Sequence, residues 1–171
     1  MTATWNAGDR ARLATWLFIG ANSVLFLMLF IAFVIFHNAD ASRNLNLSIG
    51  LVLTASILTG AFTARKAAIV SLALGIVFLG IQIADVRRLI SHNITAASSP
   101  FDTAYFTLTG IHALSVVVGL IALGLFVAAK NRPGFHGERR EAAQSALSLY
   151  WYFLAAVWVL IFAVAYLGGL V

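Results

Sequence analysis

Residues 13–36 read LATWLFIGANSVLFLMLFIAFVIF, an apolar stretch without a single charged side chain. A helix that spans a bilayer needs about 20 consecutive, mainly apolar residues. Residues 39–41 read ADA and resemble a signal-peptidase site, but the apolar part of a signal peptide is only about 7–15 residues long. We therefore expect residues 13–36 to form a retained transmembrane helix.

Four further apolar runs follow along the chain. They occupy residues 45–64, 67–86, 103–129 and 145–170. Only 10% of the residues are charged, against about 25% in a soluble domain. Backbone groups in lipid must be hydrogen-bonded within their own segment, which favours helices. The alternation typical of barrel strands is absent from the sequence. These features predict an all-α membrane protein, with five transmembrane helices in a single domain of residues 1–171.

Short polar segments separate the apolar runs. Arg65 and Lys66 leave room only for a tight turn, which predicts an antiparallel hairpin of the second and third helices. Residues 37–44 read as a polar loop, and residues 87–101 as a longer loop with Pro100 near its end. Residues 130–144 are the most charged segment, and Pro133 and Gly134 mark a turn within it.

The distribution of Lys and Arg predicts a cytoplasmic N-terminus. Cytoplasmic loops of membrane proteins carry an excess of these residues. With this orientation the inner side holds Arg10, Arg12, Arg65, Lys66, Lys130, Arg132, Arg139 and Arg140, and the outer side holds Arg43, Arg87 and Arg88. The bias explains the net charge of +5 without a nucleic-acid partner. Aromatic side chains are expected near both interfaces, namely Trp16, Tyr150, Trp151 and Tyr152 inside and Tyr105 and Tyr166 outside.

Small residues recur at the four-residue spacing that lets membrane helices approach closely. The pairs are Ser56 and Gly60, Ser71 and Gly75, and Gly80 and Ala84. The alternative is that Gly and Ala are simply common in such helices. The spacing favours close helix packing.

A few polar side chains fall inside the predicted helices, where they are candidates for function. They are Asn22, Gln82, Asp85, His112 and Ser115. A structural interpretation stands beside the functional one. His112 would make an interhelical hydrogen bond, and Asp85 would be satisfied by Gln82, an arginine or a neighbouring helix.

The same residues argue against a redox or transport site. The sequence has no cysteine, which excludes disulfides and thiolate metal sites. His112 has no second histidine at its depth for haem ligation, and with Asp85 it forms no proton relay across the bilayer. A small transporter or channel remains the competing class, but it would need helices broken near mid-bilayer. Both prolines are expected in loops.

Five sequence motifs, in order along the chain, resemble subunit III of the haem–copper oxidases. Residues 109–116 read TGIHALSV, with Gly119 after them, and resemble the family's T-G-x-H-x-L-H-V-x-x-G segment. Residues 150–158 read YWYFLAAVW, ending at Trp158, and resemble Y-W-H-F-V-D-x-V-W. Residues 16–19, read onward to Phe33, resemble the W-L-F-x-x-S-E-x-x-F-F helix. Leu45-Asn46 resembles L-N-T, and Gln82 with Asp85 resembles Q-x-x-E. The resemblance covers residues 13–170, and the five-helix count is similar to the bacterial form that lacks the first two of seven helices.

Several polar positions of the family pattern differ here. The carboxylate of the first motif falls at Asn22, and the second histidine of the T-G-x-H motif falls at Ser115. The histidine and aspartate of the last motif fall at Tyr152 and Ala155, and Asp85 replaces the glutamate of Q-x-x-E. The missing glutamate is associated in the family with bound phospholipid and with support of proton uptake.

The resemblance implies an accessory, non-redox subunit in a bacterial cytoplasmic membrane. Such a subunit binds no cofactor itself, and haem with copper would lie in its partner, the catalytic subunit I. It would support assembly, lipid retention and stable turnover of that subunit. A related alternative is the subunit-III-like protein associated with nitric oxide reductase, whose partner holds haem and non-haem iron. Candidate contacts with phospholipid are Asn22 in a cleft and Arg65, Lys66, Lys130 and Arg132 at head groups, since a cation near an anionic surface gains about 1 kcal/mol.

Overall fold

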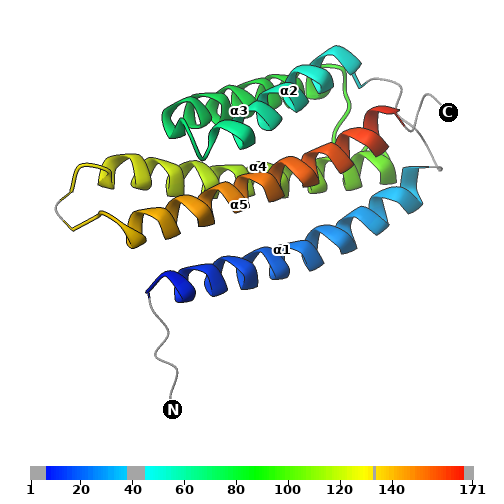
Figure 1. Ribbon diagram of the computed structural model, residues 1–171. Coiled ribbons are helices and arrows are strands. Elements are labelled where there is room, and N and C mark those ends of the chain that lie inside the picture. The colour runs from blue at the N-terminus through cyan, green and yellow to red at the C-terminus, as the bar shows by residue number, and fades with distance from the viewer. Residues whose placement is uncertain (1–6, 38–44, 133, 168–171) are drawn as a thin grey trace.

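The computed structural model describes residues 7–37, 45–132 and 134–167, which form five α-helices and one π-helical turn (Figure 1). The elements are α1 (Ala7–His37), α2 (Leu47–Thr63), α3 (Ala68–Ser91), α4 (Pro100–Ala129), α5 (Glu138–Phe162) and the π turn η1 (Ala163–Leu167). No strand occurs in these ranges. The predicted polar loop at 38–44 with Arg43, and Pro133, lie outside the described residues.

Four of the helices are long and apolar enough to cross a membrane, namely α1, α3, α4 and α5 continued by η1. Helix α2 is also apolar but has only 17 residues, which gives it a length of about 25 Å. That is near the lower limit for a spanning helix. The predicted all-α, multi-pass membrane fold is confirmed. Inner and outer ends are named below by the orientation that the charges predict.

Helix α5 occupies the centre of the bundle. It packs against α1, α2 and α4, whereas α3 packs against α2 and α4. In Figure 1, α1 lies along one side of the α4–α5 pair and the α2–α3 hairpin lies along the other. Large side chains of α5 that are fully buried include Trp151, Leu154, Trp158 and Ile161.

The predicted α2–α3 hairpin is present, and its turn occupies residues 64–67. A hydrogen bond joins its two helices, and close packing seats α3 against α5. The Ser71 hydroxyl donates to the Gly60 carbonyl oxygen at 2.6 Å. A Cβ at Gly75 would lie 2.5 Å from the Trp151 ring of α5, so only glycine allows this contact.

Helix α2 begins where the sequence provides a cap. The Asn46 side chain accepts hydrogen bonds from the backbone N–H groups of Ser48 and Ile49, at 2.9 and 3.4 Å. Such a cap satisfies backbone donors that have no partner within the helix. The Leu45-Asn46 motif therefore marks the start of α2.

Several helices continue past the predicted apolar spans. Helix α3 reaches Ser91 instead of residue 86, so Arg87 and Arg88 belong to the helix and not to the following loop. Asn93, with a φ of 62°, then ends it, and the Ile94 N–H bonds the Leu89 carbonyl oxygen at 3.0 Å. This is the Schellman stop.

Pro100 was predicted for a loop, and that prediction is wrong. Pro100 is the first residue of α4, a position where its missing N–H removes no hydrogen bond. Ser99 caps this end, because its hydroxyl accepts from the Asp102 N–H at 3.0 Å. Helix α5 begins at Glu138, before the predicted residue 145. Glu138 and Glu141 lie in its first turn, where negative side chains interact favourably with the helix dipole.

Candidate functional site

His112 of α4 lies at the meeting point of four helices and is fully buried. Its Nε2 lies 3.0 Å from the Leu154 carbonyl oxygen of α5. Since a carbonyl can only accept, Nε2 carries the proton. Its Nδ1 has no hydrogen-bond partner among the described residues. The imidazole therefore ties α4 to α5.

Aromatic rings surround the imidazole of His112. The ring centroids of Phe26 (α1), Phe78 (α3) and Trp158 (α5) lie 6.2, 5.6 and 5.3 Å from it. Phe78 and Trp158 also meet edge to face, 4.9 Å apart, an arrangement that aromatic quadrupoles favour. This cluster connects α1, α3, α4 and α5 at one depth.

Two further hydrogen bonds cross between helices near this depth. The indole Nε1 of Trp158 donates to the Thr54 hydroxyl of α2 at 3.0 Å. The amide Nε2 of Gln82 donates to the Thr109 carbonyl oxygen of α4 at 3.0 Å. The motif residues Gln82, His112 and Trp158 therefore each join a different pair of helices.

Ser115 and Tyr150 form a contact between α4 and α5 on the inner side of His112. The Ser115 hydroxyl donates to Ile111 of its own helix at 3.0 Å. The hydrogen bond between the helices comes instead from the Tyr150 hydroxyl, which donates to the Ser115 carbonyl oxygen at 2.9 Å. A backbone atom at position 115 makes the contact, so the bond does not depend on a histidine there.

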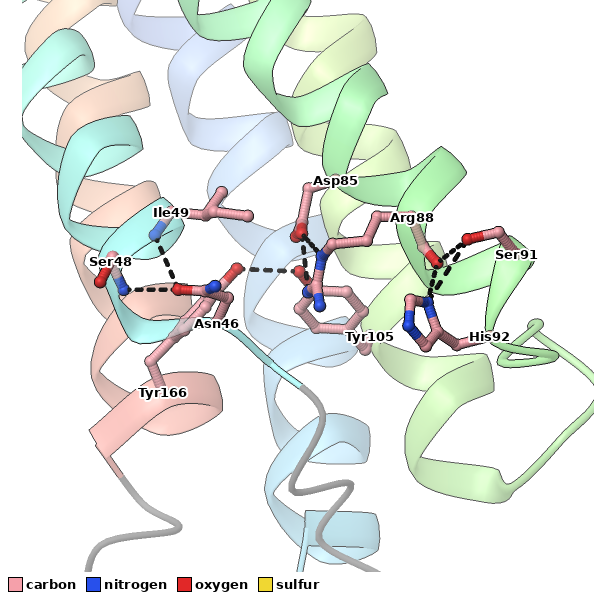
Figure 2. A network of polar contacts seen from close by, with 9 residues as sticks. All are labelled: Asn46, Ser48, Ile49, Asp85, Arg88, Ser91, His92, Tyr105 and Tyr166. Atoms are coloured by element: carbon pink, nitrogen blue, oxygen red, sulfur yellow. Dashed lines mark hydrogen bonds and ion pairs between the residues drawn. The ribbon is translucent and has the colours of Figure 1, made fainter.

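Asp85 belongs to a second polar group near the outer end of the bundle (Figure 2). Its carboxylate pairs with the Arg88 guanidinium at 2.9 Å, within α3. Nearby, the hydroxyls of Tyr105 on α4 and Tyr166 on η1 lie 3.1 Å apart. Asp85 has its counter-charge one turn away on its own helix, and the tyrosine pair holds the π turn against α4.

The described ranges hold no group of three or more His, Cys, Asp or Glu side chains that could bind a metal ion. The buried polar side chains instead bond backbone and side-chain groups of neighbouring helices. Their arrangement supports packing between helices.

The lipid candidates lie on the surface of the bundle. Two hollows follow the α1–α4 side, an outer one of about 610 Å³ lined by Leu29, Ala32 and Thr103, and an inner one of about 390 Å³ lined by Phe18, Ala122 and others. Asn22 is half-buried one turn beyond Phe18, and its Nδ2 donates to the Phe18 carbonyl oxygen at 2.9 Å. It lines neither hollow itself.

The four predicted head-group cations are all exposed, and they lie in the two inner turns. Arg65 and Lys66 lie between α2 and α3, whereas Lys130 and Arg132 follow α4. The Gln144 amide of α5 donates to the Arg65 carbonyl oxygen, which fixes one of these turns to the start of the central helix.

Two surface predictions are corrected by the structure. Tyr150, Trp151, Tyr105 and Tyr166 were expected at the interfaces but are buried in the core. Only Trp16 and Tyr152 of the predicted aromatic residues are exposed. Of the small pairs, Ser56–Gly60 and Ser71–Gly75 are buried between helices, but Gly80 and Ala84 face outward. Depth along a helix can be inferred from the sequence, whereas the direction of a side chain around it depends on the neighbours.

Three interhelical bonds involve residues that were not picked out from the sequence for these contacts. They are the Tyr105–Tyr166 pair, Ser71 with Gly60, and Thr54 with Trp158. Their partners are between 11 and 104 positions apart in the chain. The sequence signals were the small size of Ser71 and Gly60 and the position of Trp158 in a motif, and none of them identified the bonding partner.

The family model "Cytochrome c oxidase subunit III" matches residues 43–170. The chain belongs to this family. It is 29% identical to "Cytochrome c oxidase subunit 3" of Bacillus subtilis, with 96% of this chain and 89% of that one aligned. It is also 29% identical to "Quinol oxidase subunit 3" of Bacillus spizizenii (92% and 87% aligned) and to "Cytochrome bo(3) ubiquinol oxidase subunit 3" of Pseudomonas aeruginosa (96% and 88%).

Membership of the subunit III family confirms the predicted resemblance. As a subunit III, the chain is an accessory component of a haem–copper oxidase. This membership implies that the chain forms a complex with other oxidase subunits. Within this family fold, Asn46 caps its own helix α2, whereas Gln82 and His112 bond the neighbouring helices α4 and α5.

Proposed function

We propose that this chain supports the assembly, lipid retention and stable turnover of the catalytic subunit I of a haem–copper oxidase in a bacterial cytoplasmic membrane. It acts without redox chemistry of its own. Haem and copper are the cofactors of the partner, and phospholipid is the ligand of this chain.

The main support for the proposal is that the buried polar side chains form hydrogen bonds between helices. His112, Gln82 and Trp158 each form a hydrogen bond to another helix. A polar side chain in lipid needs a partner, and a packed neighbour supplies it. The chain is therefore built to hold a fixed shape beside another protein.

The α1–α4 side supports the lipid part of the proposal. Its two hollows are lined mainly by apolar side chains and follow one another along α1. Residues four apart lie on one face of a helix, so Phe18, Asn22 and Leu29 form a stripe between the hollows. An acyl chain fits such a surface. Lys130 and Arg132 follow α4 at its inner end, where anionic head groups are attracted to cations. Arg65 and Lys66 lie in the α2–α3 turn, on the other side of the bundle, where they would bind head groups of other lipids.

Purification in a mild detergent tests the proposal as a whole. We expect the tagged chain to bring down a haem-bearing subunit, whose optical spectrum identifies its haems and whose metal content shows copper. Recovery of the chain alone or as a homo-oligomer would contradict the proposal and favour a transporter. Haem beside non-haem iron would assign the partner to nitric oxide reduction instead.

The lipid assignment is tested by Asn22→Leu in the purified complex, with Ser23→Leu as the matched control. Both side chains bond a carbonyl of their own helix, but Ser23 is exposed and lies on the neighbouring face of α1. We expect Asn22→Leu to lower phospholipid phosphorus per haem and to shorten the period of constant turnover, and Ser23→Leu to change neither. Native lipid content and turnover in both variants would disprove the cleft assignment.

A further inference from the structure

A groove between α3 and α4 lies apart from the α1–α4 side. We call it the α3–α4 groove. Its walls include Ile83, Val86 and Arg87 of α3 and Gly110, Ala113 and Leu114 of α4, and it encloses about 440 Å³. Gln82 and Thr109, which bond each other, lie along it.

The middle of the groove is open because α4 carries small residues there. A Cβ added to Gly110 would meet no atom within 4 Å, so no side chain of the described residues fills this place. Gly110 and Ala113 are three positions apart, and Ile83 and Leu114 stand exposed on either side. Small residues between apolar walls let the backbone of another transmembrane helix approach closely.

Gln82 supplies the second observation. It is 6% exposed, its Nε2 donates to Thr109, and its Oε1 has no partner among the described residues. A buried acceptor without a donor is unfavourable. Gln82 lies five residues from Arg87, or about 7.5 Å deeper along α3. Acyl chains have no hydrogen-bond donor at that depth, whereas a side chain of a protein helix does. Neighbouring side chains cover this oxygen in the free chain, so a donor of the incoming helix reaches it only when these side chains move aside.

Arg87 adds a charge at the outer end of the groove. Its neighbour Arg88 pairs with Asp85, whereas Arg87 is exposed and has no acidic partner among the described residues. A cation at the membrane surface attracts a carboxylate of a neighbouring protein. Within the described part of the chain, the groove therefore has an apolar middle, an unpaired acceptor at Gln82 and an unpaired cation at Arg87, nearer its outer end.

We infer that the α3–α4 groove receives one transmembrane helix of the catalytic subunit. That helix presents a small residue to Gly110, a hydrogen-bond donor at the depth of Gln82 and a carboxylate near Arg87. The inference rests on the proposed function and names the surface by which this chain attaches to its partner.

Gly110→Leu tests the inference, because it fills the groove from a position where the added side chain meets no atom of its own chain. Gly80→Leu is the matched control. It makes the same change on α3, also in open space and outside the groove. We expect Gly110→Leu to lower the haem-bearing subunit recovered per chain about tenfold, and Gly80→Leu to leave it unchanged. Retention of the partner by Gly110→Leu would overturn the inference, whether or not phospholipid is lost.

Cross-linking gives a second measurement that does not depend on weakened binding. The chain has no cysteine, so Ala113→Cys and the control Ala84→Cys each provide a single thiol. Ala84 is exposed on the side of α3 away from the groove. After labelling with a thiol-reactive photo-cross-linker, we expect Ala113→Cys to join the haem-bearing subunit and Ala84→Cys not to.

The opposite cross-linking pattern would overturn the inference. Failure of the unaltered chain to co-purify with any haem protein would instead contradict the proposed function. The two failures are therefore distinguishable.

Discussion

Helices α1 and α5 are both long and apolar, but they occupy opposite kinds of place in the bundle. Of the most apolar window in each span, 17% is buried for α1 and 50% for α5. Helix α5 packs on α1, α2 and α4, whereas α1 packs mainly on α4 and α5. The apolar side chains of α1 therefore mostly face outward, and those of α5 mostly face other helices.

The difference teaches that hydropathy decides whether a segment crosses the membrane but not where it stands among its neighbours. Lipid is as apolar as a leucine side chain, so burial between helices is driven by packing and hydrogen bonds. Helix α5 has both, through Trp151, Trp158, Tyr150 and the Leu154 carbonyl. Helix α1 meets the core through aromatic contacts such as Phe26 and Phe33.

The largest difference in stability between variants of α5 and α1 is expected from Trp158→Ala. Trp158 is 1% exposed, contacts the rings of Phe78 and His112, and donates a hydrogen bond to Thr54. Removing it leaves a cavity and should lower the free energy of unfolding by about 3 kcal/mol. Trp16→Ala on α1, where the ring is 59% exposed, should change it by less than about 0.5 kcal/mol. Unfolding by a denaturing detergent, followed by circular dichroism, measures both, and equal losses would contradict the comparison.

An intermediate effect is expected from overpacking the contact between α3 and α5. In Gly75→Ala the new Cβ would lie 2.5 Å from the Trp151 ring and 2.7 Å from Leu120, which should lower stability by about 1–3 kcal/mol. Gly80→Ala on the same helix meets nothing within 4 Å, and alanine should stabilise α3 there by about 0.5–1 kcal/mol. The same unfolding assay should give opposite signs. A stable Gly75→Ala variant would show that this glycine is not needed for the contact.

The smallest change in stability is expected from removing a single hydrogen bond. Tyr150→Phe removes the hydroxyl that donates to Ser115, at an expected loss of about 0.6 kcal/mol, the average for a hydrogen bond between membrane helices. Tyr152→Phe removes a hydroxyl from an exposed ring of the same helix and should have no effect. Replicate unfolding curves resolve the two, and indistinguishable curves would mean that the α4–α5 contact depends on packing alone.

The predicted site residues illustrate how far sequence reasoning reached. The motifs placed Gln82, His112 and Trp158 within helices, and hydropathy put them at membrane depth. Their partners, Thr109, Leu154 and Thr54, could not be predicted, because two are backbone carbonyls and every residue carries one. The prediction of interfacial aromatic residues was partly wrong for a related reason. Trp151 and Trp16 are both tryptophans in apolar stretches, so the sequence does not distinguish them. Gly75 of α3 makes room for the Trp151 ring in the core.

The helical crossing of a membrane and the membership of the subunit III family could both be inferred from the amino-acid sequence, because apolar length and spaced motifs are local properties. Tertiary structure alone decided which face of each helix is buried, and thereby which polar groups are matched and which groove stays open. The physical reason is that lipid and protein interior are equally apolar, so only shape and hydrogen-bond partners from distant segments distinguish them.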